Sequence, residues 1–182
     1  MDGVLVDFSS EALKLCCQIL DESSRAERYL DSKTIRKGKR KIRETQGSSW
    51  RPKTNSDLDM PLVKKMYFAA IGFAPGEFFT GLKPLNDGGG MLWPHINNSN
   101  HAVKLLTAGI PVRRAKKDVG DIMTAGEGKK QWADKWLNPP PSEVIITPAR
   151  FKQDCAKSGM IPNILVDDRV ETIREWNAHG GI

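Results

Sequence analysis

The chain has 182 residues and contains few of the residues that define several protein classes. Its three cysteines include the adjacent pair Cys16 and Cys17, which is a poor basis for a disulfide framework. Its three histidines show no zinc-ligand spacing. No apolar run approaches the roughly 20 residues that cross a bilayer, and no basic-then-apolar signal peptide opens the chain. We therefore expect a reduced, cytoplasmic protein that makes no membrane contact.

The composition is that of a globular protein. Hydrophobic residues make up 39% of the chain and charged residues 27%. These fractions exclude collagen-like, low-complexity and wholly disordered chains. The length suits one domain, or one core with an insertion.

Positive charge is concentrated in residues 33–53. The whole chain has a formal net charge of +6. This stretch alone contains nine basic residues and one acidic residue, a net charge of +8, which leaves −2 for the rest. Aromatic residues do not alternate regularly with the basic ones, so we predict a solvated, flexible loop. It would attract a phosphate-bearing substrate by long-range steering, or make a weak contact with nucleic acid.

The second half of the chain alternates between two kinds of segment. Short apolar runs that are typical of buried strands cover residues 103–107, 143–147 and 163–166. Segments with helical character cover residues 129–137, 149–157 and 171–178. This alternation predicts a parallel α/β sheet. The first half is expected to be helical, with helices from Ser9 or Ser10 to about Tyr29 and over residues 60–71.

Each of the three apolar runs ends in polar residues, namely Thr107, Thr147 and the pair Asp167-Asp168. The ligand site of an open α/β sheet lies at the carboxyl ends of its strands, so these groups should gather at one edge. Two adjacent carboxylates after a buried strand are costly unless a positive charge lies beside them. Oxygen ligands favour Mg²⁺. The alternative is that the acidic pair only caps a helix.

Four short motifs resemble those of the haloacid dehalogenase (HAD) superfamily of phosphatases. The opening segment Asp2-Gly3-Val4-Leu5 resembles the first motif, and Thr107, after two leucines, resembles the second. Lys152 resembles the lysine of the third motif, with Lys157 as an alternative. Asp167-Asp168-Arg169 resembles the acidic fourth motif. The four elements occur in the order that the family has.

Further residues are similar to the 5′-nucleotidase-like branch of that superfamily, which includes small phage and bacterial members. They are the segment from Gly128 to Trp132, the tryptophan Trp176 in the last helix, and Gly180-Gly181. The resemblance covers residues 1–8 and about 100–182. It implies a Rossmann-like three-layer parallel sheet for residues 1–8 and 100–182, and a helical cap insertion for residues 9–99.

The resemblance also implies a role for each matching residue. Asp2 would be the general acid and base, and would contact the metal together with Asp167 and Asp168. Thr107, Ala108, Lys129 and Lys152 would bind the phosphoryl group, and Asp2, Thr107 and Lys152 would form the catalytic set. For Lys129 and its neighbour Lys130, solvent exposure is an equally good expectation.

The nucleophilic aspartate of the family lies two residues before Asp2, and the sequence starts at Met1. The first strand of the family, which is central in its sheet, would also precede that point. We expect a late start or a fragment of a longer reading frame. The chain as written should then have little or no phosphatase activity, and a chain extended upstream by a strand and an aspartate should have it.

The leading functional prediction is a Mg²⁺-dependent phosphatase that hydrolyses nucleoside 5′-monophosphates through an aspartyl-phosphate. One alternative is a phosphatase acting on nucleic-acid ends, with residues 33–53 as its strand-binding arm. Another is an inactive HAD-like protein that only binds nucleotides or phosphate.

Overall fold

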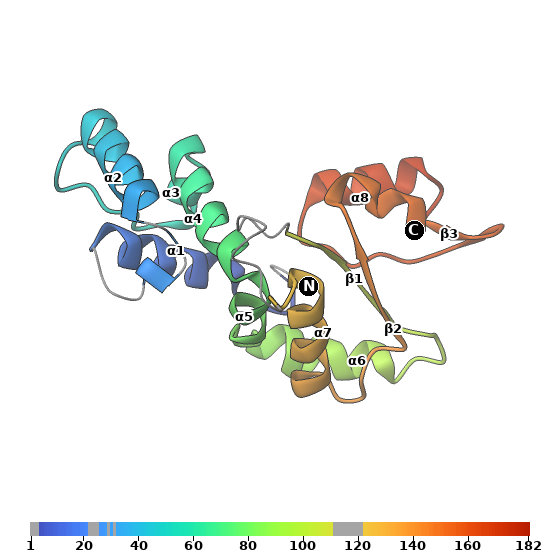
Figure 1. The fold of residues 1–182 in the computed structure, drawn as a ribbon. Coiled ribbons are helices and arrows are strands. Elements are labelled where there is room, and N and C mark those ends of the chain that lie inside the picture. The colour runs from blue at the N-terminus through green and yellow to red at the C-terminus, as the bar shows by residue number, and fades with distance from the viewer. Residues whose placement is uncertain (1–3, 22–25, 29, 31, 111–121) are drawn as a thin grey trace. The chain divides into compact units, whose positions relative to one another are not determined.

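A computed structural model describes residues 4–21, 26–28, 30, 32–110 and 122–182 of the chain. They belong to two compact units. The core unit comprises the ranges Met1–Asp7, Thr80–Gly109 and Gly126–Ile182, and the helical unit comprises Phe8–Phe79 and Ile110–Ala125. The described part of the chain is a mixed α/β structure (Figure 1).

The helical unit contains mainly α-helices and one short 3₁₀-helix. Its elements are α1 (Phe8–Leu20), η1 (Ala26–Arg28), α2 (Ser32–Gln46), α3 (Asn55–Leu58), α4 (Pro61–Phe73) and α5 (Pro75–Thr80). Pro61 begins α4, where its missing N–H is not needed for a helical hydrogen bond. No helix in the described ranges has both the length and the apolar character needed to cross a membrane.

The core of the helical unit forms where α1 packs on α3 and α4. Leu15, Cys16 and Ile19 recur at helical spacing on α1 and are buried. The ring of Phe8 lies edge-on to Tyr67 at 6.1 Å. α1 ends at Leu20, earlier than expected. Residues 22–25 and 29 of the expected helix lie outside the described residues.

The expectation of a flexible loop at residues 33–53 is wrong for its first part, because α2 is a helix of 15 residues. Ile35 and Ile42 lie seven residues apart on one face of α2 and are 5% and 2% exposed. That face packs on α1 and α4. Lysine and arginine are good helix formers, so a few apolar residues at the right spacing are enough to fix this charged segment. α2 is followed by Gly47, whose φ of 89° suits a helix C-terminus.

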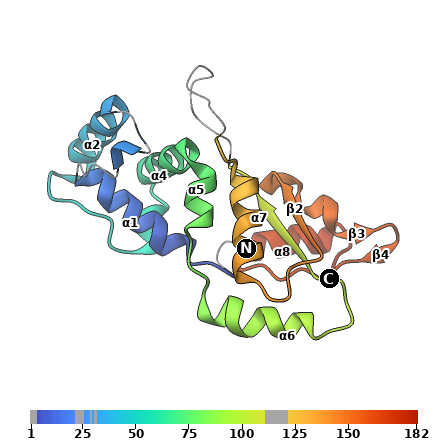
Figure 2. The same ribbon diagram turned by 60° about the horizontal axis from the view of Figure 1, so that its bottom comes forward.

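The core unit contains all four strands of the described residues and the remaining helices (Figure 2). The helices are the π-helix η2 (Asn86–Leu92), α6 (Trp93–Asn97), α7 (Ala125–Trp136), the 3₁₀-helix η4 (Ala149–Cys155) and α8 (Val170–Ala178). The strands are β1 (Lys104–Ala108), β2 (Glu143–Thr147), β3 (Lys157–Ser158) and β4 (Ile161–Pro162). The helix expected at residues 149–157 is therefore the shorter 3₁₀-helix η4.

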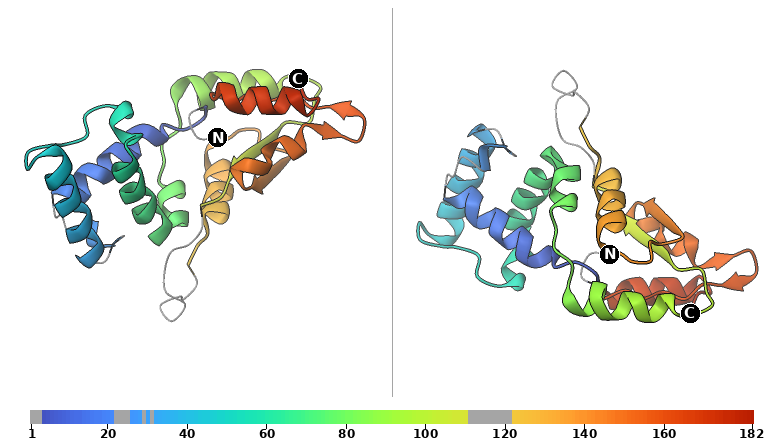
Figure 3. Two further views of the ribbon diagram at one scale, coloured as in Figure 1. Left: turned by 90° about the horizontal axis from the view of Figure 1, so that it is seen from above. Right: turned by 90° about the horizontal axis from the view of Figure 1, so that it is seen from below.

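Strands β1 and β2 pair in parallel, with Lys104 opposite Glu143 and Ala108 opposite Thr147. β3 and β4 form a short antiparallel hairpin at the edge of the core unit (Figure 3). The strand expected at residues 163–166 forms no ladder with β1 or β2. Its backbone instead bonds elsewhere, since Leu165 N–H donates to the carbonyl of Ile182 at 2.9 Å. The parallel sheet of the described residues thus has two strands.

Residues 80–97 belong to the core unit, whereas the expected boundary lay at residue 100. Buried indoles hold this segment, because Trp132 Nε1 donates to the carbonyl of Leu82 at 2.9 Å, and Trp93 Nε1 donates to the carbonyl of Pro139 at 2.7 Å. An antiparallel bridge also pairs Val6 with Pro84. Such bonds between side chains and distant backbone leave no periodic pattern in a sequence.

Candidate phosphate-binding site

The site begins at the carboxyl end of β1, at Thr107. Thr107 is 1% exposed, although its side chain is polar. Lys129 on α7 is fully buried, and its Nζ donates to Thr107 Oγ1 at 2.8 Å and to the carbonyl of Ala108 at 2.7 Å. A buried ammonium group needs partners of this kind. The hydroxyl of Thr107 accepts the bond from Lys129, and its own hydrogen can therefore donate to a ligand.

The sequence builds this contact from two neighbouring elements. β1 is parallel to β2, so the carboxyl ends of both strands lie at the same edge. α7 precedes β2 and buries Ala133 and Trp132 together with Lys129. The helix thus carries the lysine on its buried face, and Lys130, one residue further, is exposed. Lys129 is therefore not exposed to solvent, which was one of the two expectations for it, and instead contacts Thr107.

An ion pair between Lys152 and Asp167 lies at the same edge. Lys152 on η4 donates to Asp167 Oδ2 at 3.1 Å, and the two side chains are 16% and 10% exposed. The other oxygen, Oδ1, accepts the backbone N–H of Arg169 at 3.0 Å, which turns the chain into α8. Asp167 therefore has a structural role in the turn and faces a lysine in the site. η4 starts directly after β2, which is how Lys152 reaches this edge.

A cavity of about 320 Å³ joins these groups. Thr107, Ala108, Lys152, Asp167 and Asp168 all line it. Lys129 lies behind Thr107 and reaches the cavity through that hydroxyl. The structure thus brings together five of the predicted site residues on one cavity, with a sixth in direct contact. Asp2, the remaining predicted residue, lies outside the described residues.

Other charged side chains in the lining were not among the predicted site residues. They are the cations Arg150 and Arg169 and the carboxylates Glu171 and Glu175. Glu171 and Glu175 stand four residues apart on α8 and so share one helix face. That spacing is the signal in the sequence that could have pointed to them. Arg150 lies two residues before Lys152 on η4, and Arg169 directly follows Asp168.

The cavity has mixed charge, which suits an anion held together with a cation. The lysine and arginine side chains can neutralise a phosphoryl group and donate hydrogen bonds to its oxygens. The carboxylates offer hard oxygen donors of the kind that Mg²⁺ prefers. Among the described residues, no three His, Cys, Asp or Glu side chains gather closely enough to hold a metal ion. Asp167 and Asp168 both line the cavity, and Asp2, which was expected to join them, lies outside the described residues.

Lys157, the alternative to Lys152, lies in β3 and is exposed. It is not part of the cavity lining. The lysine that the structure places beside the acidic pair is therefore Lys152.

Comparisons with known proteins add no identification to this geometry. No protein-family model, curated protein or solved structure matches the chain. The function proposed below rests on the motifs and on the arrangement of the site residues.

Proposed function

We propose that the core unit belongs to a Mg²⁺-dependent phosphatase of the HAD type that acts on phosphomonoesters, with nucleoside 5′-monophosphates as the substrate class. The observation that carries the proposal is the convergence of Thr107, Lys152, Asp167 and Asp168 on one cavity, with Lys129 bonded to Thr107. These residues are separated by up to about sixty positions in the sequence, and each belongs to a different short motif or follows one. The β1–β2 pair would be part of a Rossmann-like three-layer sheet.

The described residues would act on the phosphoryl group as follows. Thr107 donates its hydroxyl hydrogen to one phosphoryl oxygen, because its acceptor side is occupied by Lys129. Lys152 places a positive charge beside the cavity and bonds the oxygens as well as Asp167. Lys129 stabilises negative charge near Thr107 from a buried position, where the low dielectric strengthens its field. Preorganised charges of this kind stabilise a phosphoryl-transfer transition state.

Asp167 and Asp168 would hold Mg²⁺ together with Asp2. When bound, the ion would neutralise phosphoryl charge and orient the ester for in-line attack. The acidic pair has a structural alternative, since Asp167 also caps the turn before α8. Asp168 is exposed in the cavity lining and is the better candidate for direct metal contact.

The nucleotide specificity rests on the resemblance of Asp167-Asp168-Arg169, Trp176 and Gly180-Gly181 to the 5′-nucleotidase-like branch. In the structure, Trp176 Nε1 donates to the carbonyl of Asn163 at 3.0 Å, and its side chain is 3% exposed. Trp176 therefore fixes the segment that leads to Asp167. It would position the acidic pair and would not stack on a base.

The decisive experiment measures binding and turnover separately on the full chain. Isothermal titration calorimetry with inorganic phosphate and with AMP, each with and without Mg²⁺, measures the affinity of the cavity for these ligands. We expect phosphate affinity to rise with Mg²⁺ and to fall about tenfold or more in Lys152→Met. Lys157→Met is the matched control and should bind as the unaltered chain does. Equal affinities in the two lysine variants would contradict the proposal.

Turnover is measured as phosphate release from AMP, by the chain as printed and by a chain extended at its N-terminus by a strand that ends in an aspartate two residues before Asp2. We expect Mg²⁺-dependent release by the extended chain, and its loss in Asp168→Asn. Phosphate binding without release in both chains would favour a binding protein over a phosphatase.

A further inference from the structure

The helical unit carries a second charged surface, which the proposed phosphatase site does not use. We define the α2 basic face as Lys33, Arg36, Lys37, Arg40, Lys41 and Arg43. All six side chains are exposed. On a helical projection they fall within less than half of the circumference, opposite Ile35 and Ile42. α2 thus has one apolar face that packs in the unit and one cationic face that points to solvent.

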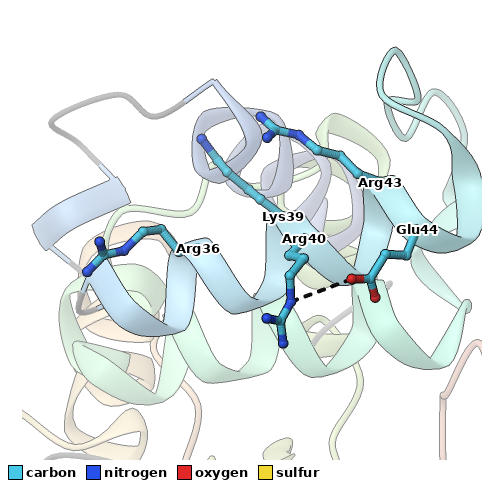
Figure 4. A pocket seen from close by; sticks show the side chains of 5 residues that line it. All are labelled: Arg36, Lys39, Arg40, Arg43 and Glu44. Atoms are coloured by element: carbon cyan, nitrogen blue, oxygen red, sulfur yellow. Dashed lines mark ion pairs between the residues drawn. The ribbon is translucent and has the colours of Figure 1, made fainter.

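Part of this face is concave. A cavity of about 310 Å³ is lined by Arg36, Lys39, Arg40, Arg43 and Glu44 (Figure 4). Glu44 is the only acid among them, and it lies 3.6 Å from Arg40 Nε in an exposed ion pair of little strength. An anion in this cavity would therefore face four cationic side chains and one carboxylate that is already paired.

Lys39, which also lines this cavity, has a buried side chain. Its side chain is 4% exposed, unlike those of the α2 basic face. Burial lowers the pKa of Lys39 below its usual value, and the positive charges of Arg43 and Arg51 lower it further. The cationic groups in this region thus repel one another. A bound polyanion would relieve that repulsion.

We infer that the α2 basic face binds the phosphate backbone of double-stranded nucleic acid without reading its sequence. The arginines Arg36, Arg40 and Arg43 extend over about 10 Å of the helix axis. Measured along the axis of a duplex, that length corresponds to the rise of about three phosphates of one strand. A single free phosphate could face only part of such a row. The cations are therefore arranged for a polymer of regularly spaced charges.

Two features of α2 favour a duplex over other polyanions. The helix has no aromatic residue, so it lacks the stacking surface that proteins use to hold single strands. Its apolar residues Ile35 and Ile42 are packed inside the unit, so they cannot insert into a lipid bilayer. The remaining contact is electrostatic, between exposed cations and a regular phosphate lattice.

The test is fluorescence anisotropy of a labelled duplex of about 20 base pairs, titrated with the full chain between about 50 and 200 mM salt. The test variant is Arg36→Gln combined with Arg40→Gln and Arg43→Gln. All three positions are exposed, and glutamine keeps helix propensity, so circular dichroism should show unchanged helix content. We expect the affinity to fall roughly tenfold or more, and the salt slope to fall by about three.

The matched control removes the same charge elsewhere, by Lys65→Gln, Lys83→Gln and Lys135→Gln, which are all exposed. This control should retain most of the affinity. An equal loss in both triple variants would overturn the inference, since net charge alone would then explain binding. Tighter binding of a single strand than of the duplex would overturn it too. So would polyglutamate or anionic vesicles that bind as tightly as the duplex, or inorganic phosphate binding in the cavity without duplex binding.

Discussion

The Nζ of Lys129 donates a hydrogen bond to Thr107 Oγ1 at 2.8 Å, and both side chains are almost completely buried. We expect Lys129→Met to weaken phosphate binding about tenfold or more, because a charge-assisted donor is lost beside the phosphoryl position. Lys130→Met, on the exposed neighbour, should bind normally. Calorimetry with inorganic phosphate measures both.

Thr107 provides a second test of the same contact, in case Lys129→Met destabilises the chain. Thr107→Ser keeps the hydroxyl and should retain phosphate binding. Thr107→Val has a similar volume without the hydroxyl and should lose binding by about tenfold. If serine and valine at this position bind phosphate equally, Thr107 does not donate to the ligand.

The pair Lys152 and Asp167 should show measurable coupling. Each side chain is mostly buried, so removal of one partner leaves the other charge poorly compensated. A double-mutant cycle with Lys152→Met and Asp167→Asn, followed by urea unfolding, should give a coupling free energy of about 1–3 kcal/mol. A value within error of zero would show that the pair adds nothing to stability.

Two glycines near α2 should respond in opposite directions to alanine. Gly38 lies within the helix, and an added Cβ would only meet Met66 Sδ at an ordinary 3.5 Å. Gly38→Ala should stabilise the chain by about 0.5–1 kcal/mol. Gly47 has a φ of 89° with open space around it, so Gly47→Ala should destabilise by backbone strain alone. Urea unfolding of the two variants tests both signs, and a destabilising Gly38→Ala would argue against the α2 helix.

Stability should fall at alkaline pH because of Cys16 and Tyr67. Burial raises the pKa of Cys16 from 9.0 to about 12, and it also raises the pKa of Tyr67 from 10.0 to about 12. The unfolded thiol ionises first, so the stability that Cys16 contributes below pH 9 is lost as the pH rises from 9 to 12. The loss from Cys16 is roughly 2 kcal/mol by pH 10.5. Cys16→Ala should flatten this part of the pH profile of unfolding, and an unchanged profile would contradict the assignment.

The buried indole of Trp132 should contribute strongly to stability. Its N–H donates to the carbonyl of Leu82, so Trp132→Phe leaves that carbonyl without this donor and opens a small cavity. We expect a loss of about 2–4 kcal/mol in thermal or urea unfolding. The control Trp136→Phe, at a position 40% exposed, should cost less than about 1 kcal/mol.

Periodic features of the fold could be predicted from the sequence. The strands expected at residues 103–107 and 143–147 form as β1 and β2, which pair in parallel, although β2 has no buried residue. The helix at residues 60–71 forms as α4. The strand predicted at residues 163–166 does not form a ladder with β1 or β2. This run is apolar, but Ile164 and Val166 are 69% and 54% exposed, and an apolar run alone does not specify a pairing partner.

The prediction for the segment that forms α2 was wrong because it relied on the density of charge. The dense lysines and arginines indicated a solvated loop, yet Ile35 and Ile42 carry the helical spacing that fixes it. In the site, the motifs selected Thr107, Lys152 and the acidic pair. The burial of Lys129 and its bond to Thr107 could not be predicted, since they depend on how α7 packs against β1. Arg150 and Glu175 were not selected as site residues, and they line the cavity because η4 and α8 place them there.

The bridge between Val6 and Pro84 joins the two parts of the core unit that flank the first helical segment. The core unit is interrupted after Asp7 and resumes at Thr80, so the two points of interruption lie next to each other. A segment whose ends meet in this way can be replaced by another of different length without moving the strands that carry the site. Replacement of the intervening helices by a short linker should therefore leave the pairing of β1 with β2 and the cavity at their carboxyl ends in place.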